Sequence, residues 1–257
     1  MTLRTLTHTL NWPGLVFVLA LLGLWQIAAG QVDSTNFPGP LAVLAALTSG
    51  AGMLISQMQH TLWRAAAGFL LALLTMLPLG LVIGRVAAAR TVLGPVIELL
   101  RPIPPLAIVP IAMLFAGIGS EAKILVIFYS ASFPLLIYAI DATQATHPAL
   151  LNTARSLGLS RAAIIRHIDL PASLPMVMVG IRLSVSMALL ISVASEMLLS
   201  SNGIGFVVTS AQEQFRIAEG IAAIVFIGVV ALLINWLLRR IESWLLAWHI
   251  GLTTSAH

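Results

Sequence analysis

Basic side chains gather in one short stretch of this sequence. The twenty residues from 152 to 171, NTARSLGLSRAAIIRHIDLP, contain three arginines and a histidine, although only 9% of the 257 residues are charged. Two kinds of chemistry are open to such a stretch. It can dock onto a partner molecule, or it can lie at a membrane surface while its arginines extend toward water.

Ionisable residues within apolar segments form a second set of candidates, because such residues are rare there and usually face a polar path. Glu196 and Met197 precede the glycine-containing turn SSNGIGF and are candidates for a solute path or its gate. The alternative is that Glu196 only binds neighbouring helix ends and holds this turn. Glu98 and Arg101 are one helical turn apart, so a local ion pair is favoured, although Arg101 could also attract an anionic solute.

Two further arginines, Arg64 and Arg182, are expected to extend toward opposite membrane faces. The segment RPIPPLAIVP contains Pro102, Pro104 and Pro105, which make a straight helix implausible. These prolines either pack as an irregular core segment or form a kinked wall of the solute path.

The sequence gives no sign of an enzyme. It contains no Gly-x-x-x-x-Gly-Lys-Ser/Thr motif for nucleotide phosphates, no cysteine, and no histidines at the spacing of metal ligands. We therefore expect no catalytic residue, no metal site and no cofactor in this chain. The 13 Lys and Arg residues form no cluster with interleaved aromatics, which excludes a nucleic-acid partner.

Composition determines what must position these residues. Hydrophobic residues make up 59% of the chain and the mean hydropathy is +1.02. A soluble domain carries roughly 25% charged residues, so this chain lacks the polar surface to face water all round. It is predicted to be an integral membrane protein embedded in a lipid bilayer.

The apolar segments predict a single domain over residues 1–257, an all-α polytopic helical bundle with six membrane spans. Residues 41–48 are too short to cross and predict an interfacial or periplasmic helix. The expected spans are 13–30, 61–84, 91–117, 121–141, 173–199 and 218–238.

Arginines predict the orientation, because loops on the cytoplasmic side are enriched in Arg and Lys. With both termini inside, eight arginines lie in inner loops, and only Lys123 and Arg216 lie in outer loops. The stretch 152–171 is then cytoplasmic. The inner residues are Arg4, Arg85, Arg90, Arg155, Arg161, Arg166, Arg239 and Arg240.

Local signals predict two short helices in the segment 146–171. Pro148 suits a first helical position, Gly158 suits a helix end, Ser160 can cap the second helix, and Pro171 limits its length. Apolar side chains near one face make a compact knob that suits a groove on a partner. These side chains are Leu157, Ile164, Ile165 and Ile168.

The spacing of this segment resembles the cytoplasmic loop of ABC importer permeases, in which Glu-Ala-Ala is followed by Gly and by Ile-x-Leu-Pro. Asn152 and Thr153 replace the usual Glu-Ala, which places the usual acidic contact in doubt. The segments RPIPPLAIVPIAMLFAGIGSEAKILVIF and SEMLLSSNGIGFVV also resemble permeases for nitrate, taurine and aliphatic sulfonates, and the likeness extends over about 60–240. In the 146–171 segment, the positions that match the permease loop are Ala154, Gly158, Ile168, Leu170 and Pro171.

The resemblance implies a transport subunit in the bacterial inner membrane, paired with a second permease copy. It further implies two separate ATPase subunits, which bind ATP and Mg and dock on the 146–171 segment, and a periplasmic binding protein that delivers solute. The residues expected to contact the ATPase are Ala154, Arg155, Gly158, Ser160, Arg161, Ile164, Arg166, Ile168, Leu170 and Pro171.

In that family the region of Glu196 approaches the path and its outer gate. The implied solute is a small anion or aromatic compound, such as a sulfonate, taurine, nitrate or a carboxylate. An ion-coupled secondary transporter is the alternative from another class, and a membrane scaffold without transport activity is a third. A secondary transporter often contains paired broken helices, whereas only one proline-broken span is visible here.

Overall fold

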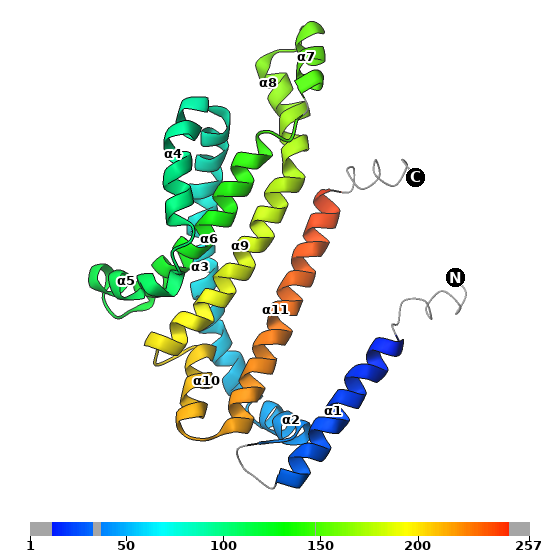
Figure 1. Cartoon of the computed structure of the whole chain (residues 1–257), viewed down its shortest axis with the longest axis vertical. Coiled ribbons are helices and arrows are strands. Elements are labelled where there is room, and N and C mark those ends of the chain that lie inside the picture. The colour runs from blue at the N-terminus through cyan, green and yellow to red at the C-terminus, as the bar shows by residue number, and fades with distance from the viewer. Residues whose placement is uncertain (1–11, 33–36, 147, 247–257) are drawn as a thin grey trace.

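The computed structural model describes residues 12–32, 37–146 and 148–246, and within these ranges the chain forms helices and no strand (Figure 1). This confirms the all-α prediction. In chain order the elements are α1 (Trp12–Val32), α2 (Pro40–Ser49), α3 (Ala51–Arg85), α4 (Ala87–Leu100), η2 (Pro105–Ile108), α5 (Val109–Ala116), α6 (Ser120–Ala142), α7 (Pro148–Ser156), α8 (Arg161–Ile164), η3 (Ile165–Asp169), α9 (Leu170–Leu199), α10 (Ile204–Glu213) and α11 (Ile217–Leu245).

Five helices are long and apolar enough to cross a bilayer, namely α1, α3, α6, the run Ile165–Leu199 and α11. The sixth predicted span is not one helix. Its two halves, α4 and the segment Pro105–Ala116, meet at an angle of 88°. Five of the predicted spans are therefore confirmed, and the third is a pair of helices bent at its prolines, which makes a sixth span if both halves belong to one crossing.

Hydrogen bonds pair several backbone groups at the break in the third span. Pro105 begins the short helix η2, where its missing N–H costs nothing, and the Ala107 amide donates to the Pro104 carbonyl over 2.9 Å. The Tyr129 hydroxyl on α6 donates to the Leu100 carbonyl over 2.6 Å. Non-helical backbone at membrane depth needs such partners, because lipid offers none.

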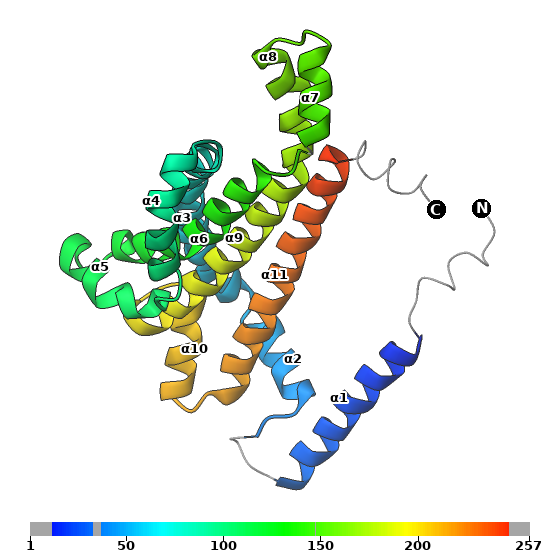
Figure 2. The same cartoon turned by 45° about the horizontal axis from the view of Figure 1, so that its top comes forward.

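The core of the bundle lies where α3, α6 and α9 run side by side, as both views show (Figures 1 and 2). Small residues allow this close contact. A Cβ atom on Gly80 of α3 would lie 2.6 Å from the Cβ of Ala139 on α6. On α9 the Ser184 hydroxyl donates to the Ala131 carbonyl of α6 over 2.8 Å. Small residues and hydroxyl groups at such interfaces are typical of membrane bundles.

Helix α1 stands apart from this core and buries none of its residues (Figure 2). It is followed in the chain by α2, which confirms that a short helix lies at 41–48. The Leu41 amide at the start of α2 donates to the side-chain oxygen of Gln26 on α1 over 3.2 Å.

The helices place functional candidates at two opposite ends of the bundle (Figure 1). We call them the α7–α8 end, near which α4 also begins, and the α10 end, where α2 also lies. Lys123 is not in a loop as predicted, because α6 already begins at Ser120. Which end faces the cytoplasm stays a prediction, and Arg4 and both chain termini lie outside the described residues.

Candidate functional site

The α7–α8 end has the two predicted short helices. Gly158 has a φ of +75°, which is the left-handed conformation of a helix-ending residue. The Leu159 amide donates to the Ala154 carbonyl over 3.1 Å, and the Gly158 amide donates to the Arg155 carbonyl over 3.0 Å. The Ser160 hydroxyl accepts from the Ala163 amide over 3.3 Å, which is the predicted helix cap.

The expected effect of Pro171 was wrong, because the second helix does not end there. Residues Ile165–Asp169 form a wider π-helical turn, in which the Leu170 amide donates to the Ile165 carbonyl. This turn leads into α9. Pro171 therefore lies in the first turn of α9, where the amide hydrogen that proline lacks is not needed as a donor. The run Ile165–Leu199 is consequently continuous from the 146–171 segment to the α10 end.

The 146–171 segment presents apolar side chains outward, as a docking surface requires. Leu157 is 75% exposed, and Leu150, Leu159 and Ile165 are exposed too. Leu157 and Ile165 do not share one face with Ile164, as the helical spacing had predicted, because Ile164 is buried. Of the remaining predicted contact residues, Ala154 is buried, Ile168 and Pro171 are half-buried, Arg155, Arg166, Leu170, Gly158 and Ser160 are exposed, and the side chain of Arg161 lies outside the part described.

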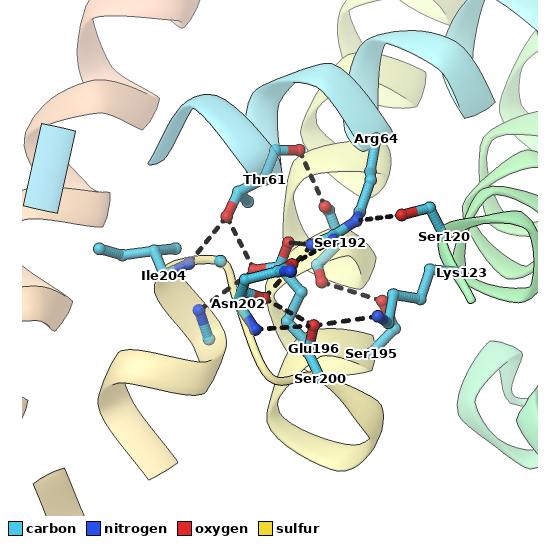
Figure 3. A network of polar contacts seen from close by, with 12 residues as sticks. Thr61, Arg64, Ser120, Lys123, Ser192, Ser195, Glu196, Ser200, Asn202 and Ile204 are labelled. Carbon is cyan, nitrogen blue, oxygen red and sulfur yellow. Dashed lines mark hydrogen bonds and ion pairs between the residues drawn. The ribbon is translucent and has the colours of Figure 1, made fainter. Parts of the chain in front are cut away.

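At the α10 end, Glu196 is 1% exposed and lies at the centre of a polar network (Figure 3). Its Oε1 accepts from Nη1 of Arg64 over 2.7 Å. Its Oε2 accepts from the Thr61 hydroxyl over 2.7 Å and from the Gly205 amide over 3.2 Å. A carboxylate at a helix N-terminus is favoured by the free amides and the helix dipole, so Glu196 stabilises the start of α10.

Arg64 is the second buried member of this network, at 3% exposure. The expectation that it snorkels to a membrane face was therefore wrong. Its Nε donates to the Ser120 hydroxyl over 3.2 Å, its Nη1 donates to the Asn202 carbonyl over 3.3 Å, and its Nη2 donates to the Asn202 side chain. Arg64 thus connects α3, α6, α9 and the turn before α10. A buried charge requires such partners.

The turn between α9 and α10 is shaped around the Glu196 carboxylate. Gly203 has a φ of +102°, and a Cβ atom there would collide with the carboxyl group of Glu196. The Gly203 amide donates to the side-chain oxygen of Gln57 over 2.7 Å, and the Ile204 amide donates to the Thr61 hydroxyl over 2.9 Å. These contacts are the ones expected if Glu196 holds the turn between α9 and α10. Its role in a solute path stays a prediction.

Lys123 is a member of this network that the sequence reasoning missed. Its ammonium group donates to the Ser200 hydroxyl over 2.9 Å, and the residue is 6% exposed. A cavity of about 470 Å³ opens beside it. The signal that could have found Lys123 is its position as the only lysine of the chain, directly after GIGSEA.

The other path candidates lie elsewhere. Arg101 and Pro105 line a cavity of about 450 Å³ together with Tyr129, Phe133 and Asp141 of α6. Met197 lines an apolar groove between α9 and α11.

Pro102, Pro104 and Glu98 are exposed. The predicted ion pair of Glu98 with Arg101 was wrong, because the ion pairs of the described residues do not include it. Arg182 does not simply snorkel either, since it pairs with Glu242 over 3.0 Å.

The fold is similar to that of a solved transporter. A chain of the MetNI methionine ABC transporter in an inward-facing conformation matches with a TM-score of 0.63 at 18% sequence identity, covering 74% of this chain and 94% of the other. At this identity the likeness shows the fold alone.

Sequence relatives are closer. The taurine transport system permease protein TauC of Escherichia coli is 33% identical over 234 residues, covering 88% of this chain and 85% of TauC. The putative aliphatic sulfonates permease SsuC of Bacillus subtilis is 31% identical and covers 91% of this chain and 87% of SsuC. The nitrate import permease NrtB of Synechocystis is 31% identical, with 89% and 86% covered.

A family match agrees with these relatives. Residues 76–247, more than half of the chain, match the family described as the inner membrane component of binding-protein-dependent transport systems. This match includes the 146–171 segment, the broken third span and the turn after Glu196, which carried the resemblance in the sequence. The chain belongs to this family of ABC transporter permeases.

Proposed function

We propose that this chain is the transmembrane subunit of an ATP-driven importer in a bacterial inner membrane. Two copies form the solute path between them, and two separate ATPase subunits dock on the 146–171 segments from the cytoplasm. A periplasmic binding protein delivers solute to the α10 end. Membership of a permease family for binding-protein-dependent transport supports this assignment, as does the absence of a nucleotide-binding motif in the sequence.

The observation that carries the proposal is the exposed apolar surface on the 146–171 segment. Leu150, Leu157 and Leu159 lie at the end of the molecule that the arginines assign to the cytoplasm. Exposed leucines at a water-facing end are unfavourable unless a partner covers them. A groove on another subunit that accepts this short helix pair would bury them.

The helix arrangement provides a route for mechanical coupling. The run Ile165–Leu199 is continuous, so its two ends move together when the segment at its start is displaced. Its far end carries Glu196, which is bound to α3 and to the first turn of α10. Closure of the ATPases around ATP would move the docked segments and tilt α9 with them. Such a differential contact is what shifts a population between inward and outward states.

The proposed solute is a small anion, delivered by the binding protein. TauC, SsuC and NrtB are named for taurine, aliphatic sulfonates and nitrate. These solutes share a compact oxyanion, and we propose only that the solute of this chain carries such a group.

The test replaces Leu157 and measures partner binding. Leu157→Glu places a charge in the docking surface without touching the buried core, so the purified chain should keep its stability. It should lose co-purification with the ATPase encoded beside it, together with ATP-dependent uptake in proteoliposomes. Leu157→Met keeps the apolar volume and should bind and transport like the natural chain. Undiminished ATP-dependent uptake by Leu157→Glu, or uptake by this chain without any ATPase, would refute the proposal; the second result would favour a secondary transporter.

A further inference from the structure

The buried charges at the α10 end do not balance. Arg64 and Lys123 are both nine-tenths or more buried, and Glu196 is the buried carboxylate of the same network (Figure 3). Glu196 pairs with Arg64 over 2.7 Å. Among the described residues, no carboxylate lies within 4.0 Å of the Lys123 ammonium group. One buried positive charge therefore has no ion-pair partner, which is costly in a protein interior.

Lys123 also has unused hydrogen-bonding capacity. An ammonium group has three donors, and the described structure gives Lys123 one acceptor, the Ser200 hydroxyl at 2.9 Å. The charged groups that interact electrostatically with the Lys123 ammonium group are Arg64, Glu196 and Glu121. Glu121 is exposed, so water screens its charge, and it does not replace a direct partner.

The cavity beside Lys123 is a candidate anion site by its volume and by the groups that line it. Its volume is about 470 Å³, within the range of sites for small ligands, which is about 300–1,000 Å³. Arg64 and Lys123 line it together with the exposed Ser201. Gly119 and Ser120 line it as well, at the N-terminus of α6, where the N-cap residue Gly119 makes no side-chain hydrogen bond and the carboxylate of Glu121 lies close to Gly119. The amides of a first helical turn favour negative charge, so the helix end and the lysine act in the same direction.

We propose that this cavity binds the acidic group of the transported solute, a compact oxyanion such as a sulfonate, nitrate or carboxylate, as it enters at the α10 end. The anion would neutralise the unpaired charge of Lys123 and accept hydrogen bonds from its free donors and from Ser201. Arg64 would mainly supply positive potential, because four of its five N–H donors are already used within the network. The statement that the solute enters at the α10 end rests on the proposed function, whereas the binding of an anion in the cavity does not.

The test is equilibrium binding of radiolabelled ethanesulfonate to the full chain in phosphatidylcholine nanodiscs. Ionic strength is held constant with sodium chloride, and nitrate and acetate serve as competitors. We expect saturable binding that the competitors displace. Lys123→Met should weaken it at least about tenfold, the loss of one charge-assisted contact, whereas Lys123→Arg should stay within about threefold. Arg182→Gln, which removes a cation paired with Glu242 outside the cavity, should bind like the natural chain.

A second variant tests the proposal independently if Lys123→Met fails to fold. Ser201→Glu places a negative charge at the exposed wall of the cavity without altering the buried network, and it should abolish binding with no loss of thermal stability. The proposal is overturned if none of the three anions binds saturably, or if Lys123→Met and Ser201→Glu bind like the natural chain. A lipid phosphate carries the same chemistry. If phosphatidylglycerol nanodiscs suppress ethanesulfonate binding, the cavity belongs to a lipid headgroup and the solute assignment fails.

This experiment separates the two proposals. Lys123→Met should still co-purify with the ATPase. Its cavity is lined by the turn between α9 and α10, and this α10 end is opposite to the α7–α8 end of the bundle (Figure 1). Failure of the natural chain to bind any ATPase would remove the proposed function and leave anion binding measurable on the isolated chain.

Discussion

At the scale of single residues, the contacts that matter most join positions far apart in the sequence. Glu196 was recognised from the sequence because an acidic residue in an apolar span is rare. Its partner Arg64 lies 132 positions away, so no local spacing could pair them. Both Arg64 and Lys123 were instead assigned from their distance to a span end, which cannot distinguish an exposed cation from one held in a network.

We predict that the Arg64–Glu196 pair contributes to stability mainly by balancing charge. Arg64→Met should lower the free energy of unfolding by about 3–5 kcal/mol, because it leaves the buried carboxylate without its cation. The double variant Arg64→Met, Glu196→Met should recover part of this loss. Unfolding of the detergent-purified chain, followed by helical circular dichroism, measures both effects. A double variant whose loss equals the sum of two independent single losses would contradict this reading.

At the scale of elements, prolines illustrate what sequence can predict. The prolines of RPIPPLAIVP predicted a broken third span, and the structure shows a bend of 88° there. Pro171 gave the opposite result, because a π turn before it allows the helix to continue into α9. A proline removes one donor in either case, but its effect depends on whether the preceding turn can widen, which is decided by tertiary packing.

The broken span makes a prediction about Tyr129, whose hydroxyl is bonded to the Leu100 carbonyl. Tyr129→Phe should lower the free energy of unfolding by about 0.5–1.5 kcal/mol, the net value of a typical hydrogen bond. Tyr138→Phe is the matched control, since that hydroxyl makes no hydrogen bond within the described residues. The same unfolding measurement applies, and an equal effect of the two substitutions would show that the bend does not depend on this contact.

At the scale of the whole molecule, composition was sufficient for the membrane-protein class, and the apolar segments were sufficient for the helical architecture. The six-span count followed from segment lengths, because bilayer thickness limits how short a crossing helix can be. The sequence could not predict the structural connection between the α7–α8 end and the α10 end. It depends on the continuity of Ile165–Leu199 through a π turn and on the contacts of Glu196 at its far end.

The central claim is that the 146–171 segment faces the cytoplasm and is covered by an ATPase. The chain contains no cysteine, so single-cysteine variants can be labelled cleanly. Leu157→Cys marks this segment, and Phe215→Cys marks the loop between α10 and α11, where the native side chain is similarly exposed at 72%. The measurement is labelling by a membrane-impermeant maleimide in right-side-out and inside-out vesicles, with and without the ATPase.

We predict labelling of Leu157→Cys only in inside-out vesicles, and strong protection once the ATPase is bound. Phe215→Cys should be labelled only in right-side-out vesicles and should be indifferent to the ATPase. Labelling of Leu157→Cys from the outside, or unchanged labelling in the presence of a transport-competent ATPase, would contradict the account.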